Sequence, residues 1–382
     1  MADYEIIIAG AGPAGSATAL HLANLDPDLA GRVLLLDKAV FPRPKLCAGG
    51  VTADAELVLR QIGVNVDLPS VPIHTSRFVL PAGSLTVQRP SHFRVFRRDE
   101  FDNHLFQNVR ERGVGTQDGE TVEDIIRTSA EVIVRTSKNE YRAKVLIGAD
   151  GANSTVRRLL DLRRGGRMMM ALEIFAPAEQ VVVRDFVEHM AVFDFSLTSD
   201  GVPGYCWIFP AAHQGSPILS LGIIGAPFRE GEAISLKTAF ARWLKGHGVD
   251  LSQFDLRGHP ALRYEPRACC SRPRVLLAGD AAGIDPLFGE GITSALAQGV
   301  IAAQAAYDAV RTGKFSFSNY EKRIRSSSIG TLMRRRRLLA RRLYTSPIFG
   351  RRHSQYAALL KWVALIDPQK RFGTVTWHPA SA

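Results

Sequence analysis

Cysteine is scarce in this sequence. Among 382 residues there are four, Cys47, Cys206, Cys269 and Cys270, and no two of them are spaced as C-x-x-C. This spacing favours neither a disulfide framework nor a metal site. Long apolar runs are also absent, since no stretch approaches the roughly 18 apolar residues that a membrane-spanning helix needs. The chain begins directly with a strand-like segment, so we expect no signal peptide and a cytoplasmic protein.

Acidic residues are nearly absent from one segment close to the C-terminus. Residues 321–352 contain eleven Lys or Arg residues and one acid, whereas the formal net charge of the whole chain is +11. The rest of the chain is therefore close to neutral, and the basic character is a local feature. No nucleic-acid-binding module is recognisable in the segment, so we expect no nucleic-acid partner.

The N-terminal region carries a dinucleotide-binding pattern. An apolar run at residues 6–8 predicts a buried parallel strand, and "GAGPAG" follows it with Gly10, Gly12 and Gly15 in a GxGxxG pattern. These glycines allow a tight turn, close approach of a pyrophosphate and close helix packing. The following helix begins around Ala14, and its N-terminus offers free N–H groups to the phosphates.

A second strand, "RVLLLDK", ends in Asp37 and Lys38. Asp37 is placed to accept hydrogen bonds from a ribose hydroxyl, and we assign Lys38 to the same cofactor site. These N-terminal features alone leave NAD and FAD both open.

Two later motifs favour FAD. The first, "GADGANSTVRRLL", places Asp150 and Gly151 between a strand and a helix, and the second, "LAGDAAGIDPLFGEGI", places Gly279 and Asp280 at a strand end. Asp280 can hold a ribityl hydroxyl. The helix N-terminus near Gly291 can face the flavin N1/C2=O edge and stabilise the negative charge of reduced flavin.

GxGxxG, then DGxxSxxR, then GD before a glycine-rich loop, in this order, resembles the FAD enzymes of the para-hydroxybenzoate hydroxylase fold over nearly the whole chain. In "RRDEFDNHL" the resemblance implies that Arg98 lies near the FAD. Hydroxylases, halogenases and reductases share these motifs, so the motifs indicate the fold and the cofactor rather than the reaction.

Three details resemble the geranylgeranyl reductases within that superfamily. "GYCWIFP" matches their Y-x-W-x-F-P signature through Tyr205, Trp207 and Phe209, and "PRPKLCAGG" resembles their P-R-x-K-x-C-G-G loop. "GDAAGIDPLFGEGI" matches their GDAAG…P…GEGI loop, which implies cofactor contacts for Pro286, Gly289, Glu290, Gly291 and Ile292.

The resemblance further implies that Cys47 lies beside the flavin ring, on the face where substrate enters, with Ala48 and Gly49 also at the cofactor. A helix N-terminus or a cation such as Lys45 can lower the pKa of the thiol and make it a proton donor or redox partner. The alternative is a small packed thiol in a tight loop. The sequence departs from the family pattern at Ala48 and at Ser220, where glycine is expected.

Between residues 168 and 270, strands separated by turn residues replace the strand–helix alternation. We expect a mixed or antiparallel sheet over the flavin, with residues 234–248 as a helix on its outer side. Tyr205, Trp207 and Phe209 alternate along one strand and therefore share a face. Such an aromatic row suits an apolar isoprenoid substrate, and plain core packing is the alternative.

The predicted fold class is α/β, with a Rossmann-like FAD-binding domain interleaved with a β-sheet substrate domain and followed by a helical C-terminal segment. The predicted limits are 1–75, 98–165 and 271–310 for the FAD-binding domain, 76–97 and 166–270 for the substrate domain, and 311–382 for the basic helical segment. In that last segment the arginines from Arg334 to Arg342 flank an apolar helical stripe and can lie on an anionic membrane surface. A capping helix with a solvated basic face, or one that meets a partner's acidic patch, is the alternative.

The resemblance implies an FAD-dependent oxidoreductase that reduces C=C bonds of a geranylgeranyl or prenyl lipid, quinone or pigment precursor by hydride transfer from reduced flavin N5. Cys47, Tyr205 and Trp207 are the predicted catalytic residues. The alternatives are a monooxygenase or halogenase of an aromatic or polyketide compound, and a non-catalytic, membrane-docked flavoprotein that binds a prenyl lipid. There is no second GxGxxG, so NAD(P)H, ferredoxin or a flavin reductase can each supply electrons. We expect a cytoplasmic location with peripheral contact to the inner membrane face.

Overall fold

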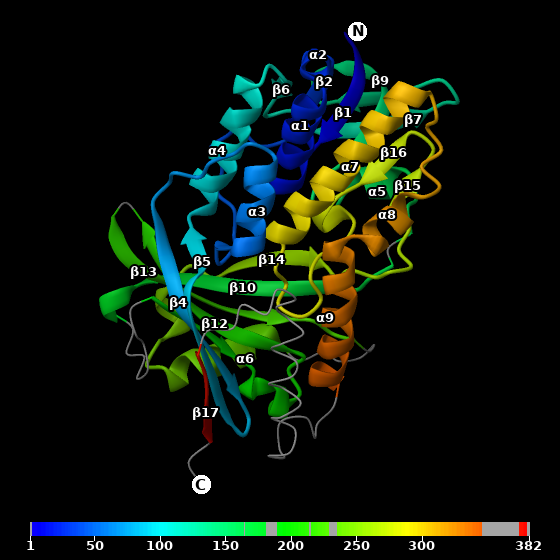
Figure 1. Cartoon of the computed structure of the whole chain (residues 1–382). Coiled ribbons are helices and arrows are strands. Elements are labelled where there is room, and N and C mark those ends of the chain that lie inside the picture. Colours follow the sequence, from blue (N-terminus) through cyan, green and yellow to red (C-terminus); the bar gives the residue numbers. More distant parts are fainter. Residues whose placement is uncertain are drawn as a thin grey trace.

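The protein is built around two sheets, one above the other in Figure 1. The computed structural model describes residues 2–163, 165–180, 189–213, 215–228, 235–345 and 374–379. The N-terminus lies at the far end of the first sheet, and the last described strand lies at the opposite end of the molecule.

The first sheet has the order β15-β16-β9-β1-β2-β6, with β8 also paired to β9 and β7 paired to β8. Its central strand β1 (Ala2–Ala9) runs parallel to β2 (Val33–Leu36) and to β9 (Glu140–Gly148). Residues 6–8 are fully buried, because a parallel sheet is covered on both faces. The other strands of this sheet are β6 (Gly115–Gln117), β7 (Val122–Arg127), β8 (Val132–Thr136), β15 (Ser271–Arg272) and β16 (Val275–Leu277).

Three long helices cover this sheet, with α1 (Pro13–Leu25) between α4 (Arg98–Glu111) and α7 (Ile292–Thr312). The shorter elements of this half are α2 (Pro27–Ala30), α3 (Ala53–Gln61), α5 (Thr155–Leu159), a 3₁₀ turn (Gly279–Ala281), α8 (Tyr320–Ser326) and α9 (Ser328–Thr345). In Figure 1, α9 leaves the first half and runs down beside the second sheet.

The second sheet has the order β14-β10-β13-β12-β11-β4-β5-β17, with β3 paired to β5. Most neighbours are antiparallel, but β11 (Met190–Asp194) runs parallel to β4 (Ser70–Leu80), so the sheet is mixed, which is one of the two arrangements predicted. Its outer face packs against α6 (Leu236–Gly246). The other elements are β3 (Gly50–Thr52), β5 (Gly83–Phe96), β10 (Met168–Pro177), β12 (Gly204–His213), β13 (Ser216–Gly225), β14 (Arg257–Leu262), β17 (Thr374–Pro379) and 3₁₀ turns at Ala178–Gln180, Ser196–Asp200 and Leu251–Gln253.

The predicted fold class is confirmed, and the sheet membership differs from the sequence prediction in two places. β3 and the first residues of β4 lie before residue 76 yet belong to the second sheet. Residues 374–379 form a strand on β5, where we expected helix; their alternation of Thr with apolar residues is typical of a strand. Residues 181–188 of one predicted strand and residues 346–373 of the basic segment lie outside the described residues. The domain limits themselves remain a prediction.

Candidate active site

The glycine loop after β1 requires glycine at two positions. Gly10 has φ +104°, and a Cβ there would lie 2.3 Å from the carbonyl oxygen of Ala149. A Cβ at Gly15 would lie 1.8 Å from the carbonyl oxygen of Gly10. Gly12 is the N-cap of α1 and has no side chain to cap the helix. The N–H groups of the first turn of α1 therefore donate no hydrogen bond to an N-cap side chain. This is the local arrangement that a phosphate group fits.

Asp37 directly follows β2 and reaches the same loop. One carboxylate oxygen accepts a hydrogen bond from the Ala11 N–H at 2.7 Å, and the other accepts one from the Ala39 N–H at 2.8 Å. These two bonds fix the acid at the mouth of the glycine loop, and a carboxylate keeps lone pairs for a further donor. Lys38 is exposed beside it. The roles of both residues toward a ribose remain predictions.

Two guanidinium groups, the buried one of Arg98 and the half-buried one of Arg43, share one carboxylate beside the glycine loop. Arg98 binds Asp102 through Nε and Nη2 at 2.9 and 3.0 Å, and Arg43 Nη2 lies 3.1 Å from the same carboxylate. Arg98 is 7% exposed and Asp102 is fully buried. Arg43 Nη2 would also lie 3.7 Å from a Cβ placed on Gly12. The two guanidinium groups carry one positive charge more than the Asp102 carboxylate neutralises. This charge lies beside the glycine loop, where a pyrophosphate would bind.

A lysine–histidine contact extends this cationic region to the second sheet. Lys45 Nζ lies 2.5 Å from Nε2 of His259 on β14. Burial and Arg98 lower the pKa of Lys45 to about 8, although Asp280 raises it. Burial and the nearby lysine lower the pKa of His259 to about 3, so the imidazole is neutral. Sequence reasoning assigned no role to His259, because a single histidine on a strand carries no spacing pattern.

Cys47 lies half-buried in the loop between β2 and β3. Its Sγ accepts a hydrogen bond from the Gly49 N–H at 3.4 Å. Gly49 has φ +78°, and a Cβ there would lie 2.0 Å from the carbonyl oxygen of Phe96, so only glycine fits. Burial lowers the pKa of Arg98, but Asp102 and the thiol of Cys47 outweigh it and raise that pKa above its ordinary value. The thiol thus lies beside the buried guanidinium of Arg98, whereas the sequence had suggested Lys45 as the nearby cation; its place beside a flavin ring remains a prediction.

The two aspartate motifs follow neighbouring parallel strands, because Gly148 at the end of β9 pairs with Leu277 at the end of β16. Asp150 lies just after β9, where one oxygen accepts from the Val156 N–H at 3.0 Å. The other oxygen is buried and has no hydrogen-bond partner within the described ranges. Burial raises the pKa of Asp150 and also that of Asp280, where Lys45 and Arg98 oppose the rise. A buried carboxylate oxygen without a donor can accept a hydrogen bond from a hydroxyl or N–H of a ligand.

Arg157 of the first aspartate motif is structural. Its guanidinium donates to the Ala281 carbonyl oxygen at 2.6 and 2.9 Å, and to the carbonyl oxygens of Leu162, Arg163 and Cys269 at 2.9 to 3.2 Å. It therefore joins the helix after Asp150 to the turn after Asp280.

The glycine-rich loop before α7 lies between the two sheets. Gly289 has φ +63°, and a Cβ there would lie 2.4 Å from Cδ1 of Ile224 on β13. The carboxylate of Glu290 accepts from the Thr293 N–H at 2.7 Å. Burial raises the pKa of Glu290 to about 7, opposed by Arg336 and by Thr293. Pro286 and Ile292 are buried on either side of this turn, and Gly291, the N-cap of α7, supplies no side-chain cap.

The predicted aromatic row forms a wall on the inner face of the second sheet. Tyr205, Trp207 and Phe209 lie on one face of β12, and the Tyr205 hydroxyl donates to the Phe288 carbonyl oxygen at 2.7 Å. Phe193 of β11 adds a ring 5.0 Å from that of Phe209 and 5.8 Å from that of Tyr205. Burial raises the pKa of the Tyr205 hydroxyl far above its ordinary value, so this group stays protonated. Sequence reasoning missed Phe193 and Phe288, which come from other elements.

The cysteine loop touches this wall. A Cβ at Gly50 would lie 3.5 Å from the Phe93 ring and 3.8 Å from the Phe209 ring, and Ala48 packs against the same cluster. The structure therefore brings Cys47, the cations and the aromatic wall together.

These features fit a bound flavin dinucleotide. The glycine cradle admits a phosphate, the paired guanidiniums supply positive charge, and Asp150 leaves a buried acceptor open. No group of three or more His, Cys, Asp or Glu side chains in the described ranges is arranged to hold a metal ion. Among the helices that the structure describes, none is long and apolar enough to span a bilayer.

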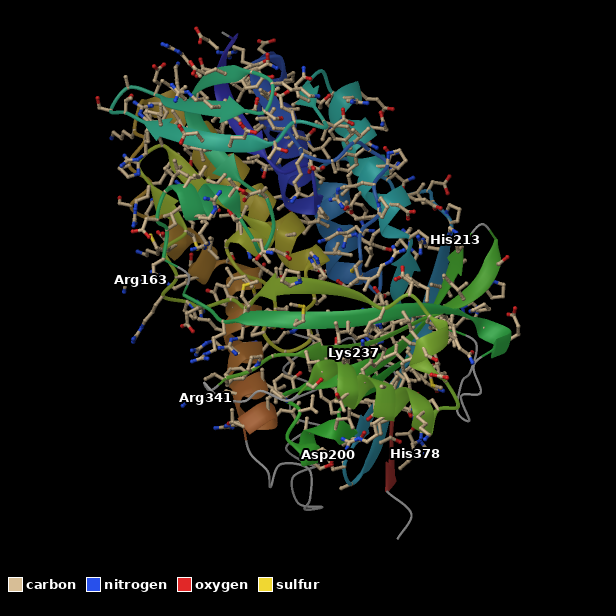
Figure 2. All side chains as sticks on the ribbon, turned by 180° about the vertical axis from the view of Figure 1, so that it is seen from behind. Arg163, Asp200, His213, Lys237, Arg341 and His378 are labelled. Carbon is tan, nitrogen blue, oxygen red and sulfur yellow. The ribbon has the colours of Figure 1, made fainter. Side chains whose placement is uncertain are left out.

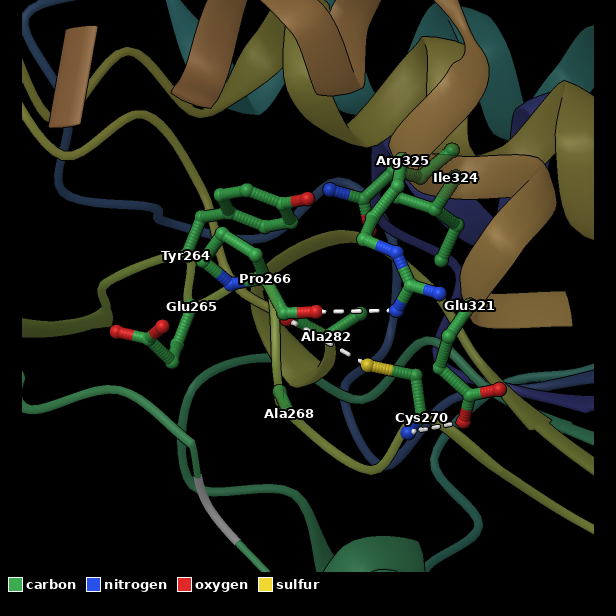
Figure 3. Close-up of a pocket in the computed structure, with 10 residues that line it drawn as sticks. Tyr264, Glu265, Pro266, Ala268, Cys270, Ala282, Glu321, Ile324 and Arg325 are labelled. Carbon is green, nitrogen blue, oxygen red and sulfur yellow. Dashed lines mark hydrogen bonds between the residues drawn. The ribbon is translucent and has the colours of Figure 1, made fainter. Parts of the chain in front are cut away.

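A separate small cavity lies under α8 (Figure 3). It is lined by residues that include Tyr264, Cys270, Gln298 and Arg325, and its volume is about 10 Å³. The Tyr264 hydroxyl and the Gln298 amide oxygen are buried there without a hydrogen-bond partner in the described part of the chain. The space suits at most one water molecule, so it is not a substrate site.

Comparison with known proteins gives one family and several relatives. The FAD binding domain family matches residues 3–305. A digeranylgeranylglycerophospholipid reductase of Methanoculleus marisnigri is 28% identical over 350 residues, covering 87% of this chain and 84% of the relative. A geranylgeranyl bacteriochlorophyll reductase-like protein from Thermoplasma acidophilum has a similar structure, with TM-score 0.78 and 23% identity over 97% of this chain and 98% of that one. A flavin-dependent brominase has TM-score 0.70 and 19% identity over 95% of this chain and 93% of its own. These two structures are evidence for the shared fold alone.

Proposed function

The chain belongs to the FAD binding domain family and is an FAD-dependent oxidoreductase of the geranylgeranyl reductase type, and we propose that it reduces C=C bonds in the prenyl chain of a lipid, quinone or pigment precursor. The observation that carries this proposal is the contact between the Cys47 loop and the aromatic wall. A thiol beside a buried cation lies at one edge of an apolar surface, where a hydrocarbon chain would find shape complementarity and few polar groups.

Each part of the site has a role in this reaction. Bound and reduced, FAD supplies the hydride for one alkene carbon. Cys47 holds the proton for the other carbon, and Arg98 with the Gly49 N–H stabilises the thiolate that remains. Tyr205 and Trp207 orient the chain and exclude water from the reacting bond.

For the cofactor we propose the contacts that the sequence predicts. The glycine loop and its helix start take the pyrophosphate, Asp37 and Lys38 the ribose side, and the later motifs the flavin side. The proposed contacts are Gly10, Gly12, Ala14, Gly15, Asp37, Lys38, Cys47, Ala48, Gly49, Arg98, Asp150, Gly151, Gly279, Asp280, Pro286, Gly289, Glu290, Gly291 and Ile292. The electron donor is NAD(P)H, ferredoxin or a flavin reductase.

A membrane contact through α9 is part of the same proposal. Two of its arginines turn inward: Arg336 binds Asp285 at 2.6 Å and Arg337 binds Glu265 at 2.7 Å. The outward face carries exposed arginines on either side of Leu338, which is 60% exposed. Figure 2 shows Arg341 directed away from the fold. Cations around an exposed apolar side chain suit the cytoplasmic face of an anionic bilayer, which would present the prenyl substrate.

One mass measurement tests the reaction. The FAD-bound protein is reduced without oxygen and mixed with geranylgeranyl diphosphate, a geranylgeranyl glycerophospholipid or a prenylquinone. We expect a product heavier by about two mass units per reduced double bond. Cys47→Ala should lose this product while Cys269→Ala, which removes another half-buried thiol, should keep it. No anaerobic product, with a gain of about sixteen mass units on an aromatic substrate in air, would instead identify a monooxygenase.

A further inference from the structure

Glu173 is a buried acid to which the proposed reaction assigns no role. It lies on β10 and is 1% exposed. Glu173 pairs with Gly222 of β13, which in turn pairs with Trp207 of β12. Residues paired directly across strands point to the same face, so Glu173 shares the inner face with Trp207. Gly222 leaves the space between them, because a Cβ there would lie 2.0 Å from the Trp207 ring.

A hydrogen-bonded row links this acid to the aromatic wall. Trp207 Nε1–H donates to Ser220 Oγ at 2.9 Å, and the Ser220 hydroxyl donates to Oε1 of Glu173. Oε2 of Glu173 is buried and has no hydrogen-bond partner among the residues that the structure describes. A charged oxygen left in this state is costly, so the carboxyl group favours holding a proton. Ser220 stands where the reductase pattern has glycine, which explains why that pattern did not indicate this row.

Glu173 also lies near the cysteine loop, because Lys45 of that loop contacts His259 of β14, and His259 pairs with Ala171, two residues before Glu173 on the same face of β10. Burial raises the pKa of Glu173 to about 7, and Ser220, Arg97, the backbone N–H of Cys47 and Arg98 oppose the rise. Arg98 in turn interacts with the thiol of Cys47. The carboxyl group and the thiol therefore face one shared guanidinium, and the charge of each influences the other.

The remaining charged groups near β10 come from β14 and from the loop before β3. Arg257 pairs with Glu173 across the strands, is exposed, and binds Asp255 at 2.7 Å. His259 stays neutral, with a pKa of about 3, and its partner Lys45 has a pKa of about 8. Of these three groups, only Lys45 has a pKa near that of Glu173.

We propose that Glu173 is the acid that reprotonates Cys47, and that Ser220 is its positioning residue; this inference rests on the proposed function. When the Cys47 S–H bond breaks and its proton goes to the alkene carbon, a thiolate remains beside Arg98. The O–H proton of Glu173 passes to that thiolate, and the resulting carboxylate takes up one proton (H⁺) from the solvent. One proton is consumed per double bond, which is the proton that reduction needs beside the hydride.

The test uses the FAD-bound protein, oxidised and without substrate. Alkylation of Cys47 by iodoacetamide is followed by peptide mass spectrometry between pH 5.5 and 9.5. In the wild-type protein, deprotonation of Glu173 near pH 7 adds a negative charge that disfavours the thiolate, so the pH–rate profile should carry an inflection near pH 7 in addition to the contribution of Lys45 near pH 8. In Glu173→Gln this charge never forms. We expect one inflection fewer and, at pH 8, alkylation about three- to ten-fold faster.

Two further variants test whether the effect is specific to Glu173. Ser220→Ala removes a bond that favours the charged carboxylate, so the lower inflection should move upward by roughly half a pH unit or more. Asp194→Asn is the matched control, because Asp194 is a buried acid that accepts from the Trp243 N–H at 2.8 Å on the opposite face of the same sheet. It should keep the wild-type profile. A Glu173→Gln profile equal to that of the wild type, or the same change in Asp194→Asn, would overturn the inference.

Turnover provides a second readout. The wild-type reduction rate should fall as pH rises above about 7, because Glu173 then lacks the proton to return. In Glu173→Gln the rate should be low and lack this fall. Alkylation needs no substrate, so failure to reduce any prenyl compound counts against the proposed function, whereas an unchanged alkylation profile counts against the role of Glu173.

Discussion

Replacing Gly49 by alanine tests the loop that positions Cys47. Gly49 has φ +78°, and an added Cβ would lie 2.0 Å from the Phe96 carbonyl oxygen. The two residues are also joined by a backbone hydrogen bond, Phe96 N–H to Gly49 O, at 3.0 Å. The clash therefore cannot be relieved by turning a side chain, and the strand pairing between β3 and β5 has to move.

Gly113 offers a matched control. It has φ +75°, nearly the same backbone conformation, and a Cβ there would have no atom within 4 Å. Gly113→Ala should reduce the free energy of unfolding by about 1–2 kcal/mol through the left-handed conformation alone. Gly49→Ala should lose that amount and about 1–3 kcal/mol more through overpacking.

Urea unfolding of the FAD-bound proteins measures both values, and iodoacetamide reactivity reports where the thiol of Cys47 has gone. We expect Gly49→Ala to be the less stable protein, with slower reduction and an altered alkylation rate. Equal stability of the two variants, together with unchanged Cys47 reactivity, would show that the reasoning about this loop is wrong.

Two further predictions concern the cationic groups. Arg98→Ala leaves Asp102 buried with Arg43 as its remaining partner, so the affinity for FAD should fall by roughly ten- to a hundred-fold. Flavin fluorescence measures this affinity, and Arg98→Lys should retain part of it. An unchanged affinity in Arg98→Ala would exclude Arg98 from the cofactor site. The double variant Arg335→Glu/Arg341→Glu should bind phosphatidylserine vesicles roughly ten-fold or more weakly in a sedimentation assay. Lys237→Glu on α6 is the control and should leave this binding unchanged. Equal effects of the two changes would indicate non-specific charge attraction.

Several features of the site could be read directly from short stretches of sequence. Gly10, Gly12 and Gly15, the acid after β2 and the two later aspartate motifs all depend on neighbours within a few residues. Backbone sterics act at that range, so a motif specifies its own turn. The family, the cofactor and the fold class followed from the order of these motifs, and the shared face of Tyr205, Trp207 and Phe209 followed from the strand period.

Other features had no pattern in the sequence. Lys45 and His259 are 214 residues apart and meet only because the loop before β3 lies against β14. Glu173 and Ser220 are ordinary residues on separate strands, and their bond depends on the register of β10 with β13. The strand at residues 374–379 has suitable residue types, but its place on β5 depends on a free sheet edge.

The sequence by itself determined the cofactor-binding turns, the alternating aromatic face and the concentration of arginines near the C-terminus, because each of these arises from local backbone geometry or local composition. The tertiary structure decided which of those arginines are neutralised, which acid faces Cys47 and where the aromatic wall meets the cysteine loop. These outcomes depend on how the helices and loops of the first half meet the second sheet. Burial then removes water from charges that come from distant segments, and their pKa values follow from neighbours that only the fold supplies.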